Sequence, residues 1–387
     1  MTGYRWTILA TATAAQTAAA MLFQGLPAIG PQLRDGYGLT VGETGIALSA
    51  VVVGMTLTLL AWGTLSDRRG ERAVISIGLV GAAAALSGAA LTTAFSGLFL
   101  CLFAAGLFVA SANAASGRAT MGWFTARERG LALGIRQASM PVGAALAGLT
   151  LPALAAGGTL PALMGLAAIL LGAALVAALL LRPPPTPLER APAERPLRDR
   201  RIWRLSEASA LLVSVQFGYL GFLTLYLHDE RGFSAAAAAA TLAGVQLVGA
   251  ATRVALGRLS DRQGRRIAPL RRLSLVLAAG TALAGAAEAT GLDVLLPLVL
   301  AGALAAASWN GLAFTAAAEL AGGANSGTAL GLQNSVMSVV SGTTLATFGW
   351  LVSGTSWAIG FGLLALPALG AHAMLRRVPE PAASLAS

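Results

Sequence analysis

Residues 63–72 of the sequence read GTLSDRRGER, and five of these ten residues are charged. Long apolar stretches lie on both sides, in a chain that is 56% hydrophobic and only 11% charged. A second run at 257–266, GRLSDRQGRR, is nearly the same. A charged motif that occurs twice between apolar stretches indicates a duplicated membrane protein in which both copies keep one connecting segment.

The apolar stretches are long enough to cross a membrane. Soluble domains carry about a quarter charged residues, whereas this chain has a mean hydropathy of +0.74. A helix needs about 20 apolar residues to cross a hydrocarbon core about 30 Å thick. The first stretch is too long for a secretory signal and eleven more follow it. The sequence therefore predicts an all-α polytopic membrane protein whose twelve spans cover residues 6–30, 43–65, 73–95, 97–121, 130–156, 160–181, 204–227, 234–258, 271–290, 293–320, 328–352 and 355–375.

The formal charge of +10 is distributed unevenly along the chain. All 26 basic residues are arginine, and 21 of them lie in or beside alternate connecting segments if the N-terminus is cytoplasmic. Positive charge collects on the cytoplasmic side of membrane proteins, so we predict cytoplasmic termini, a location in the inner membrane and no nucleic-acid partner. The lone Cys101 lies in an apolar stretch. We therefore predict no disulfide framework, no metal site and no cofactor.

One long polar segment divides the chain. Residues 182–203, RPPPTPLERAPAERPLRDRRIW, combine dense proline with alternating charge, which is typical of a linker. At an offset of 194 residues, 62–72 and 256–266 share seven of eleven residues, and at an offset of 197, 130–140 and 327–337 share five of eleven. The sequence predicts two copies of a six-helix unit, 1–181 and 204–387, a known transporter plan.

The stretch 63–72 resembles the motif that joins helices 2 and 3 in the major facilitator superfamily and often recurs between helices 8 and 9. The first copy matches at Gly63, Leu65, Asp67, Arg68, Gly70 and Arg72, and the second at Gly257, Leu259, Asp261, Arg262, Gly264, Arg265 and Arg266. Glu71 stands where the family usually has a basic residue. The resemblance implies two pseudo-symmetric six-helix bundles, transport by alternating access, and a monomer.

The resemblance also implies that the two motifs act as a conformational latch on the cytoplasmic side. We expect Gly63 to let helix 2 pack closely on a neighbour and Asp67 to cap helix 3. Arg118, near the end of helix 4, is expected to pair with the loop that contains Asp67. The alternative is that these charges only set the membrane orientation. The predicted latch consists of Gly63, Asp67, Arg68, Gly70, Arg72, Arg118, Gly257, Asp261, Arg262, Gly264 and Arg265.

In this superfamily, helices 1, 2, 4, 5, 7, 8, 10 and 11 surround the substrate cavity. Amides and charges deep in a span are expected there, because lipid cannot satisfy their hydrogen bonds. Such residues occur almost only in the corresponding spans. The predicted substrate-binding residues are Gln16, Gln24, Asn113, Arg136, Gln137, Gln216, Tyr219, Gln246, Arg253, Trp309, Asn310, Gln333 and Asn334.

Arg253 and Arg136 suggest an anionic substrate, because no Asp or Glu lies in the middle of any predicted span. A buried arginine without a carboxylate needs an anion, backbone carbonyls or water, and a substrate carboxylate fits its planar fork. The alternative is that both arginines extend toward the cytoplasm. Helix 8, with Arg253 four residues before Gly257, resembles the monocarboxylate and oxalate/formate porters, as does the run 123–135. Those porters often carry another cation in helix 1 or 11, which this chain lacks.

The sequence thus predicts a secondary active transporter of a small organic anion, driven by exchange or by protons. The alternative function is proton-coupled efflux of drugs or other lipophilic compounds. Efflux porters usually have a glycine directly before a helix 5 proline, whereas Leu151 precedes Pro152 here, and the membrane carboxylate of that branch is missing. An enzyme is not predicted, since His228 and His372 lie at helix ends and no catalytic or metal cluster is visible.

Overall fold

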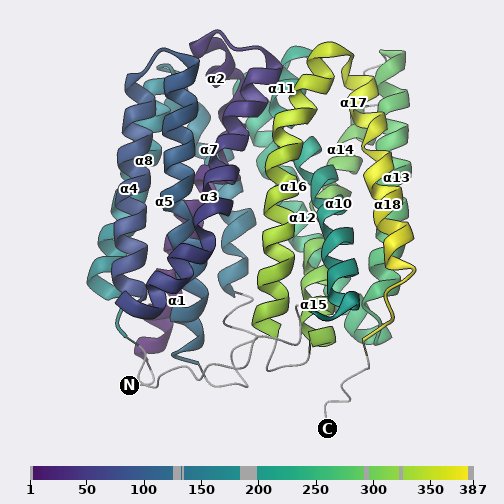
Figure 1. The fold of residues 1–387 in the computed structure, drawn as a ribbon. Helices are drawn as coiled ribbons and strands as arrows, with labels where there is room; N and C mark the ends of the chain where they lie inside the picture. The colour runs from purple at the N-terminus through teal and green to yellow at the C-terminus, as the bar shows by residue number, and fades with distance from the viewer. Residues whose placement is uncertain are drawn as a thin grey trace. The chain divides into compact units, whose positions relative to one another are not determined.

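The computed structural model describes residues 3–124, 132, 135–183, 198–291, 296–321 and 326–381 (Figure 1). Within these ranges the chain is helical and contains no β-strand. Twelve segments are long and apolar enough to cross a membrane, from Tyr4–Phe23 to Trp357–Leu375, and each coincides with one of the twelve predicted spans. The predicted fold class is therefore confirmed.

The chain forms two compact units. The first unit contains Met1–Glu189 together with Leu227–Gly244, and the second contains Arg190–Tyr226 together with Val245–Ser387. The boundary near residue 189 lies in the predicted linker, of which residues 184–197 are outside the described ranges.

The helices of the first unit pack through small residues. α3 and α5 approach so closely that a Cβ on Gly54 would lie 2.3 Å from the carbonyl oxygen of Phe103, and one on Gly106 would lie 2.2 Å from that of Val51. Such contact is the usual basis of helix association in lipid, where apolar burial gives little net driving force. The elements are α1 (Tyr4–Phe23), η1 (Leu26–Ile29), α2 (Gly30–Tyr37), α3 (Val41–Arg69), α4 (Glu71–Leu91), α5 (Phe95–Met121), α7 (Ser139–Ala155) and α8 (Thr159–Leu180).

The second unit is built around α10, which packs on α16 and α18, while α13 packs on α14, α17 and α18. Its elements, including the two that continue from or into the first unit, are α10 (Arg200–Leu220), α11 (Leu223–Asp229), α12 (Ala235–Gln263), α13 (Ile267–Thr290), α14 (Leu296–Ala306), α15 (Asn310–Ala321), α16 (Ser326–Gly354), α17 (Trp357–Leu363) and α18 (Ala365–Leu375).

Several predicted spans are interrupted rather than continuous. Helix 1 breaks at Gln24, the C-cap of α1, and helix 7 breaks at Gly221, the C-cap of α10, 197 residues later. Helix 10 breaks between α14 and α15. Hydropathy does not reveal these breaks, because the residues on either side remain apolar. Each break frees backbone carbonyls from the helix, and at membrane depth every such carbonyl must find a hydrogen-bond partner inside the protein.

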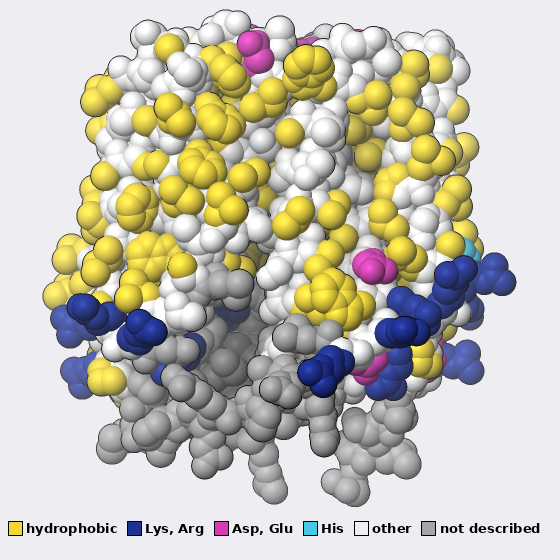
Figure 2. Space-filling view, viewed as in Figure 1, with side chains coloured by type: hydrophobic (Ala, Val, Ile, Leu, Met, Phe, Trp, Pro, Cys, Tyr) yellow, Lys and Arg dark blue, Asp and Glu magenta, His cyan; other side chains and the backbone are white. Residues whose placement is uncertain are grey.

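The surface of each unit is what a membrane-spanning chain requires. Figure 2 shows apolar side chains along the flanks of the helices and arginine side chains gathered at one end of each unit. Among the exposed apolar residues are Leu57, Leu91, Leu175 and Leu179, each at least 60% exposed. These flanks match the hydrocarbon region, and the arginine-rich ends match a polar boundary.

Candidate functional site: two latches and two arginines within the spans

The first predicted latch lies mostly inside a helix. α3 continues through Arg69, and Gly70, with φ +83°, turns the chain directly into α4. Gly70 is the N-cap residue of α4. Asp67 lies within α3, and its side chain is outside the described residues, so its capping contact stays a prediction. The close packing predicted for Gly63 is not seen among the described residues, since none of them lies within 4 Å of a Cβ built there. Close packing occurs instead at Gly54, deeper in the same helix.

Arg118 pairs with this latch through Glu71. Its Nε donates to Oε1 of Glu71 at 2.8 Å, and the Glu71 side chain is only 6% exposed. The departure from the family pattern at position 71 thus places a carboxylate on the first residue of α4, where the positive end of the helix dipole favours it. The ion pair joins α4 to the end of α5.

In the second latch the two charges of the ion pair are exchanged. Arg266, the N-cap of α13, donates to Glu319 of α15, with Nη2 and Oε1 2.8 Å apart. Its Nη1 also donates to Ser260 Oγ at 3.0 Å. In the first unit the latch supplies the anion and helix 4 the cation, whereas here the latch supplies the cation and helix 10 the anion.

Glu380 adds a contact that has no counterpart among the described residues of the first latch. Its carboxylate accepts hydrogen bonds from the backbone N–H groups of Arg266, Ile267 and Ala268, at 2.8, 2.9 and 2.7 Å. These are amides of the first turn of α13, which have no partner within the helix. The C-terminal segment therefore caps α13 at the latch. As at Gly63, a Cβ on Gly257 would meet none of the described residues within 4 Å, and the side chain of Asp261 is outside the described residues.

Arg136 is the centre of a buried polar cluster in the first unit. Its side chain donates from Nε to Ser116 Oγ at 2.9 Å, from Nη1 to Gln137 Oε1 at 3.2 Å, and from Nη2 to the Asn113 carbonyl at 3.0 Å. Longer contacts join Nη2 to Asn113 Oδ1 and Gln16 Oε1, at 3.4 and 3.5 Å. All of these acceptors are neutral, and Arg136 is only 9% exposed.

The cluster brings together four predicted site residues from three helices: Gln16, Asn113, Arg136 and Gln137. Gln16 also bonds Asn113, with Nε2 and Oδ1 3.3 Å apart, and accepts from Ser116 Oγ at 2.9 Å. Ser116 was not among the predicted site residues, although its position one helical turn after Asn113 places both on the same face of α5. None of the carboxylates that the structure describes forms an ion pair with Arg136.

Arg253 lies in the second unit against the break in helix 10. Its Nε donates to the carbonyl of Ala307 at 2.5 Å, a residue in the turn between α14 and α15. Gly249, one turn earlier on α12, permits this approach, because a Cβ there would lie 2.6 Å from Ala307 Cβ. The freed carbonyl of the broken helix is thus used to hold the arginine. The terminal nitrogens of Arg253 make no hydrogen bond to the described residues.

Other predicted site residues of the second unit carry buried oxygen or nitrogen atoms without a hydrogen-bond partner among the described residues. These atoms are Gln216 Oε1, Tyr219 OH, Trp309 Nε1, Asn310 Oδ1 and Gln333 Oε1. Tyr219 stacks on Phe361, with ring centroids 4.9 Å apart, so it belongs to the aromatic core of the unit. Buried polar atoms are normally satisfied. The first unit also has such atoms, Ser111 Oγ and Ser139 Oγ among them, so their presence alone does not mark a binding site.

The remaining predicted residues lie apart from these contacts. Asn334 donates to the carbonyl of Leu330 in its own helix, at 2.9 Å. Gln246 is buried on α12, and Gln24 occupies the break that ends α1. Residues 125–131 of the run 123–135, which contain Arg127 and Arg129, are outside the described ranges.

Comparison with known proteins agrees with this architecture. The profile of the Major Facilitator Superfamily matches residues 12–344. The chain belongs to the major facilitator superfamily. An uncharacterized MFS-type transporter of Mycobacterium tuberculosis strain H37Rv is 34% identical over 376 residues, which cover 94% of this chain and 84% of that protein. A protein of the same description from strain CDC 1551 matches equally well.

Solved structures of the superfamily share the fold. A bacterial homologue of the human lysosomal transporter Spinster, in an inward-facing and occupied conformation, superposes with a TM-score of 0.78 at 16% identity, covering 97% of this chain and 95% of that one. A D-xylose–proton symporter superposes with a TM-score of 0.77 at 18% identity, covering 98% and 99%. The superfamily consists of transporters and not enzymes, which confirms that prediction.

Proposed function

We propose that this transporter moves a small organic anion, most simply a carboxylate, across the inner membrane, and that Arg253 is its main anion contact. The observation that carries the proposal is the hydrogen bonding of Arg253. One of its five N–H groups is held by the neutral Ala307 carbonyl, which fixes the stem of the side chain and leaves the terminal nitrogens for a ligand. A carboxylate accepts two parallel hydrogen bonds from such a fork.

The surroundings of Arg136 support the same class of substrate. Its neutral partners hold the guanidinium in place but do not neutralise it. Taking an ion out of water costs several kcal/mol, and a hydrogen bond to a charged group returns about 1.5–3 kcal/mol. The cluster therefore supports a positive charge at membrane depth that an anion can compensate. In this proposal Arg253 supplies the direct contact with the anion.

The efflux alternative fits these contacts less well. A site for lipophilic cations would have to tolerate two guanidinium groups that have no carboxylate partner among the described residues, and like charges exclude such ligands. With no carboxylate in the middle of a span, we propose that the anion is driven by exchange for another anion or by entry together with a proton. The arginine distribution supports cytoplasmic termini in the same proposal.

Uptake into proteoliposomes tests the proposal. Radiolabelled monocarboxylates and dicarboxylates would be compared with their uncharged amides and with lipophilic cations, with counter-anion or an inward proton gradient as the driving force. Arg253→Gln should weaken substrate affinity roughly 30-fold or more, because truncating a desolvated charge pair costs about 2–5 kcal/mol. Arg253→Lys should restore only part of it, since lysine keeps the charge but not the fork.

Arg258→Gln is the matched control, because Arg258 is an exposed arginine one and a half turns further along the same helix. It should leave affinity unchanged. Transport of cations but not anions, or equal effects of Arg253→Gln and Arg258→Gln in folded protein, would contradict the proposal.

A further inference from the structure

One segment of the second sequence repeat is packed on the first unit. Residues Leu227–Gly244 belong to the first compact unit, although the chain before them and the chain after them belong to the second. Both boundaries fall inside helices, the first after Tyr226 in α11 and the second after Gly244 in α12. The segment 227–244 is therefore attached to the first unit by contact and to the second by the covalent chain.

The turn between α11 and α12 is held by contacts of its own. His228 Nδ1 lies 2.8 Å from the carbonyl oxygen of Phe233, and the backbone N–H of Phe233 donates to the Leu227 carbonyl at 3.0 Å. The Ser234 hydroxyl accepts from the N–H of Ala237 at 3.2 Å, at the start of α12. All of these contacts lie inside the segment 227–244, so the segment can attach and detach as one piece.

An ion pair joins this segment to α2. Arg34 of α2 donates from Nη1 to the carboxylate of Asp229, the last residue of α11, and their side chains are 21% and 18% exposed. Asp35 accepts from Nε and Nη2 of the same arginine at 3.0 Å, but it belongs to α2 itself and is 61% exposed. Of these two carboxylates, Asp229 is the one that links distant parts of the chain, 195 residues apart.

A close contact between α7 and α12 accompanies the ion pair. A Cβ on Gly148 of α7 would lie 2.9 Å from the carbonyl oxygen of Ala239 and 3.0 Å from the Cβ of Ala243. The glycine is needed for this approach, because a side chain there would have to displace α12. Small residues let membrane helices approach closely, but they bury little apolar area. The contact is therefore close in geometry and needs little free energy to open.

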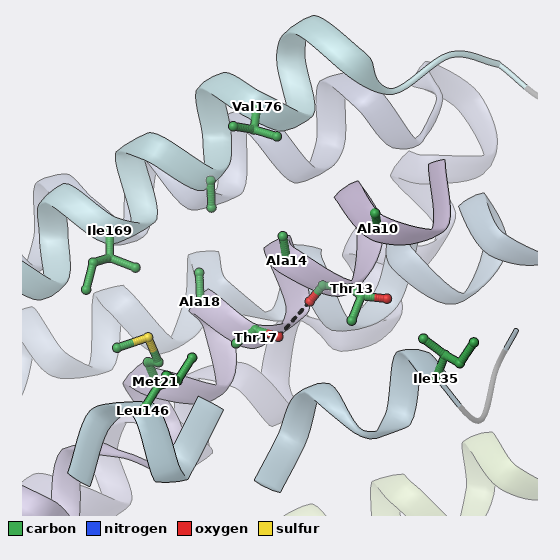
Figure 3. A pocket seen from close by; sticks show the side chains of 11 residues that line it. Ala10, Thr13, Ala14, Thr17, Ala18, Met21, Ile135, Leu146, Ile169 and Val176 are labelled. Atoms are coloured by element: carbon green, nitrogen blue, oxygen red, sulfur yellow. Dashed lines mark hydrogen bonds between the residues drawn. The ribbon is translucent and has the colours of Figure 1, made fainter. Parts of the chain in front are cut away.

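α7 itself is held by other helices of the first unit. A Cβ on Gly143 would lie 2.6 Å from the carbonyl oxygen of Thr17 in α1. Figure 3 shows Leu146 of α7 beside Met21 of α1 at an apolar pocket, which Ile169 of α8 also lines. α7 thus presents Gly148 to α12 from a fixed position in its own unit.

α12, in contrast, is divided between the two units. Beyond Gly244 it packs on the second unit, where a Cβ on Gly249 would lie 2.6 Å from Ala307 Cβ and Arg253 donates to the Ala307 carbonyl. A movement of the second unit relative to the first must therefore either bend α12 or detach residues 227–244 from α2 and α7. Bending breaks backbone hydrogen bonds that lipid cannot replace, so detachment is the easier course.

We infer that Arg34, Asp229, Gly148, Ala239 and Ala243 form a clamp, which holds residues 227–244 on the first unit and releases them when the second unit moves. Transporters built from two repeats work by movement of one repeat against the other, and the ion pair is the part of the clamp with a directional bond to break. The clamp would serve any substrate, because none of its residues is among the predicted substrate contacts.

A buried thiol measures the detachment. In a Cys101→Ser background, which removes the lone cysteine, Leu242→Cys places a thiol at a position that is 1% exposed while the segment is attached. Its rate of reaction with N-ethylmaleimide is measured in the full-length protein in nanodiscs. Arg34→Gln should raise that rate about fivefold, which corresponds to about 1 kcal/mol for a partly exposed ion pair. Asp35→Asn is the matched control and should not raise it, since the bond to Asp229 remains.

Two further comparisons separate the charges from the packing. Arg34→Asp/Asp229→Arg restores an ion pair with exchanged charges and should return the rate to within about twofold of the original. Gly148→Ala should raise the rate although the ion pair is intact, because the added methyl group meets α12. Gly172→Ala on α8 should not, since a Cβ there would meet none of the described residues within 4 Å.

Ala238→Cys provides a second reporter on the same face of α12, one turn away and also buried, should the Leu242→Cys protein not fold. Equal rates in Arg34→Gln and the original protein, equal rates in the two glycine variants, or no reaction of either thiol in any variant would each overturn the clamp. No substrate enters these measurements, so their failure would leave the proposed anion transport intact.

Discussion

Each unit of this transporter holds one arginine deep in a span, and the two are held in different ways. Arg136 makes five hydrogen bonds to side chains and backbone of its own unit. Arg253 makes one hydrogen bond to the described residues, to a backbone carbonyl freed by a broken helix. The first arginine is part of a rigid cluster. The second is anchored at one atom and retains hydrogen-bonding capacity, which is the state expected of a ligand contact.

The internal repeat sharpens this difference. At the offset of 197 residues, Arg136 corresponds to Gln333 and Asn113 corresponds to Asn310. Gln333 donates to Ser209 Oγ at 2.7 Å and to the Ala313 carbonyl at 3.4 Å, so an amide occupies the place of the guanidinium. Duplication therefore preserved a buried hydrogen-bonding position on helices 5 and 11 but kept the charge in only one copy. The second unit obtained its charge elsewhere, on helix 8.

The two latches also differ between the units. The acid and the base of the ion pair exchange places, and their side chains are exposed to different extents. Glu71 is 6% exposed and Arg118 is 33% exposed, against 16% for Arg266 and 31% for Glu319. Removing one partner of a buried pair leaves an uncompensated charge and is strongly destabilising, while an exposed pair contributes little. The two latches should therefore lose different amounts of stability when one partner of the ion pair is removed.

The largest effect on stability is expected at the first latch. Arg118→Ala leaves the Glu71 carboxylate buried without this partner and should lower the free energy of unfolding by about 3 kcal/mol. Glu319→Ala, the equivalent truncation in the second latch, should cost about 1 kcal/mol because its partner can be hydrated. Urea titration in detergent, followed by far-UV circular dichroism, measures both. Losses of equal size would show that burial does not distinguish the two latches.

A smaller effect is expected where Arg136 and Gln333 correspond. Arg136→Met removes the donor shared by Asn113, Gln16 and Ser116 and should cost about 2 kcal/mol, after relief of the buried charge offsets part of the loss. Gln333→Met should cost about 1 kcal/mol, since two hydrogen bonds are lost there. Arg136→Gln copies the second unit and should keep stability within about 1 kcal/mol of the original protein. A larger loss with glutamine than with methionine would contradict the assigned role of these hydrogen bonds.

The smallest effect is expected at the C-terminal segment. Glu380→Ala removes the acceptor of three amides at the start of α13 and should cost about 1 kcal/mol, the usual value of an N-terminal cap. Hydrogen exchange should increase at Ile267 and Ala268 and remain unchanged at the start of α4, where Gly70 offers no side-chain cap. Unchanged exchange at α13 would show that solvent replaces the carboxylate without cost.

The sequence alone determined the class of this protein and most of its framework. The twelve spans, the duplicated motif and the membership of the major facilitator superfamily follow from apolar length and local pattern, which are properties of contiguous residues. The polar residues Gln16, Asn113, Arg136 and Gln137 were also selected from sequence, because a polar side chain in an apolar span needs a partner wherever that partner lies.

Only the tertiary structure decided which partner each of these residues has. The pairing of Arg118 with Glu71 joins residues 47 positions apart, and the bond from Arg253 to Ala307 joins residues 54 positions apart. The cap from Glu380 reaches residues up to 114 positions away. Such choices depend on the rotation and depth of each helix. The Ala307 carbonyl is available only because helix 10 breaks. Every residue has a backbone carbonyl, so the sequence does not indicate which one will act as the acceptor. Hydropathy determines whether a segment crosses the membrane. The packing of the helices determines which hydrogen-bond partners its polar atoms find there.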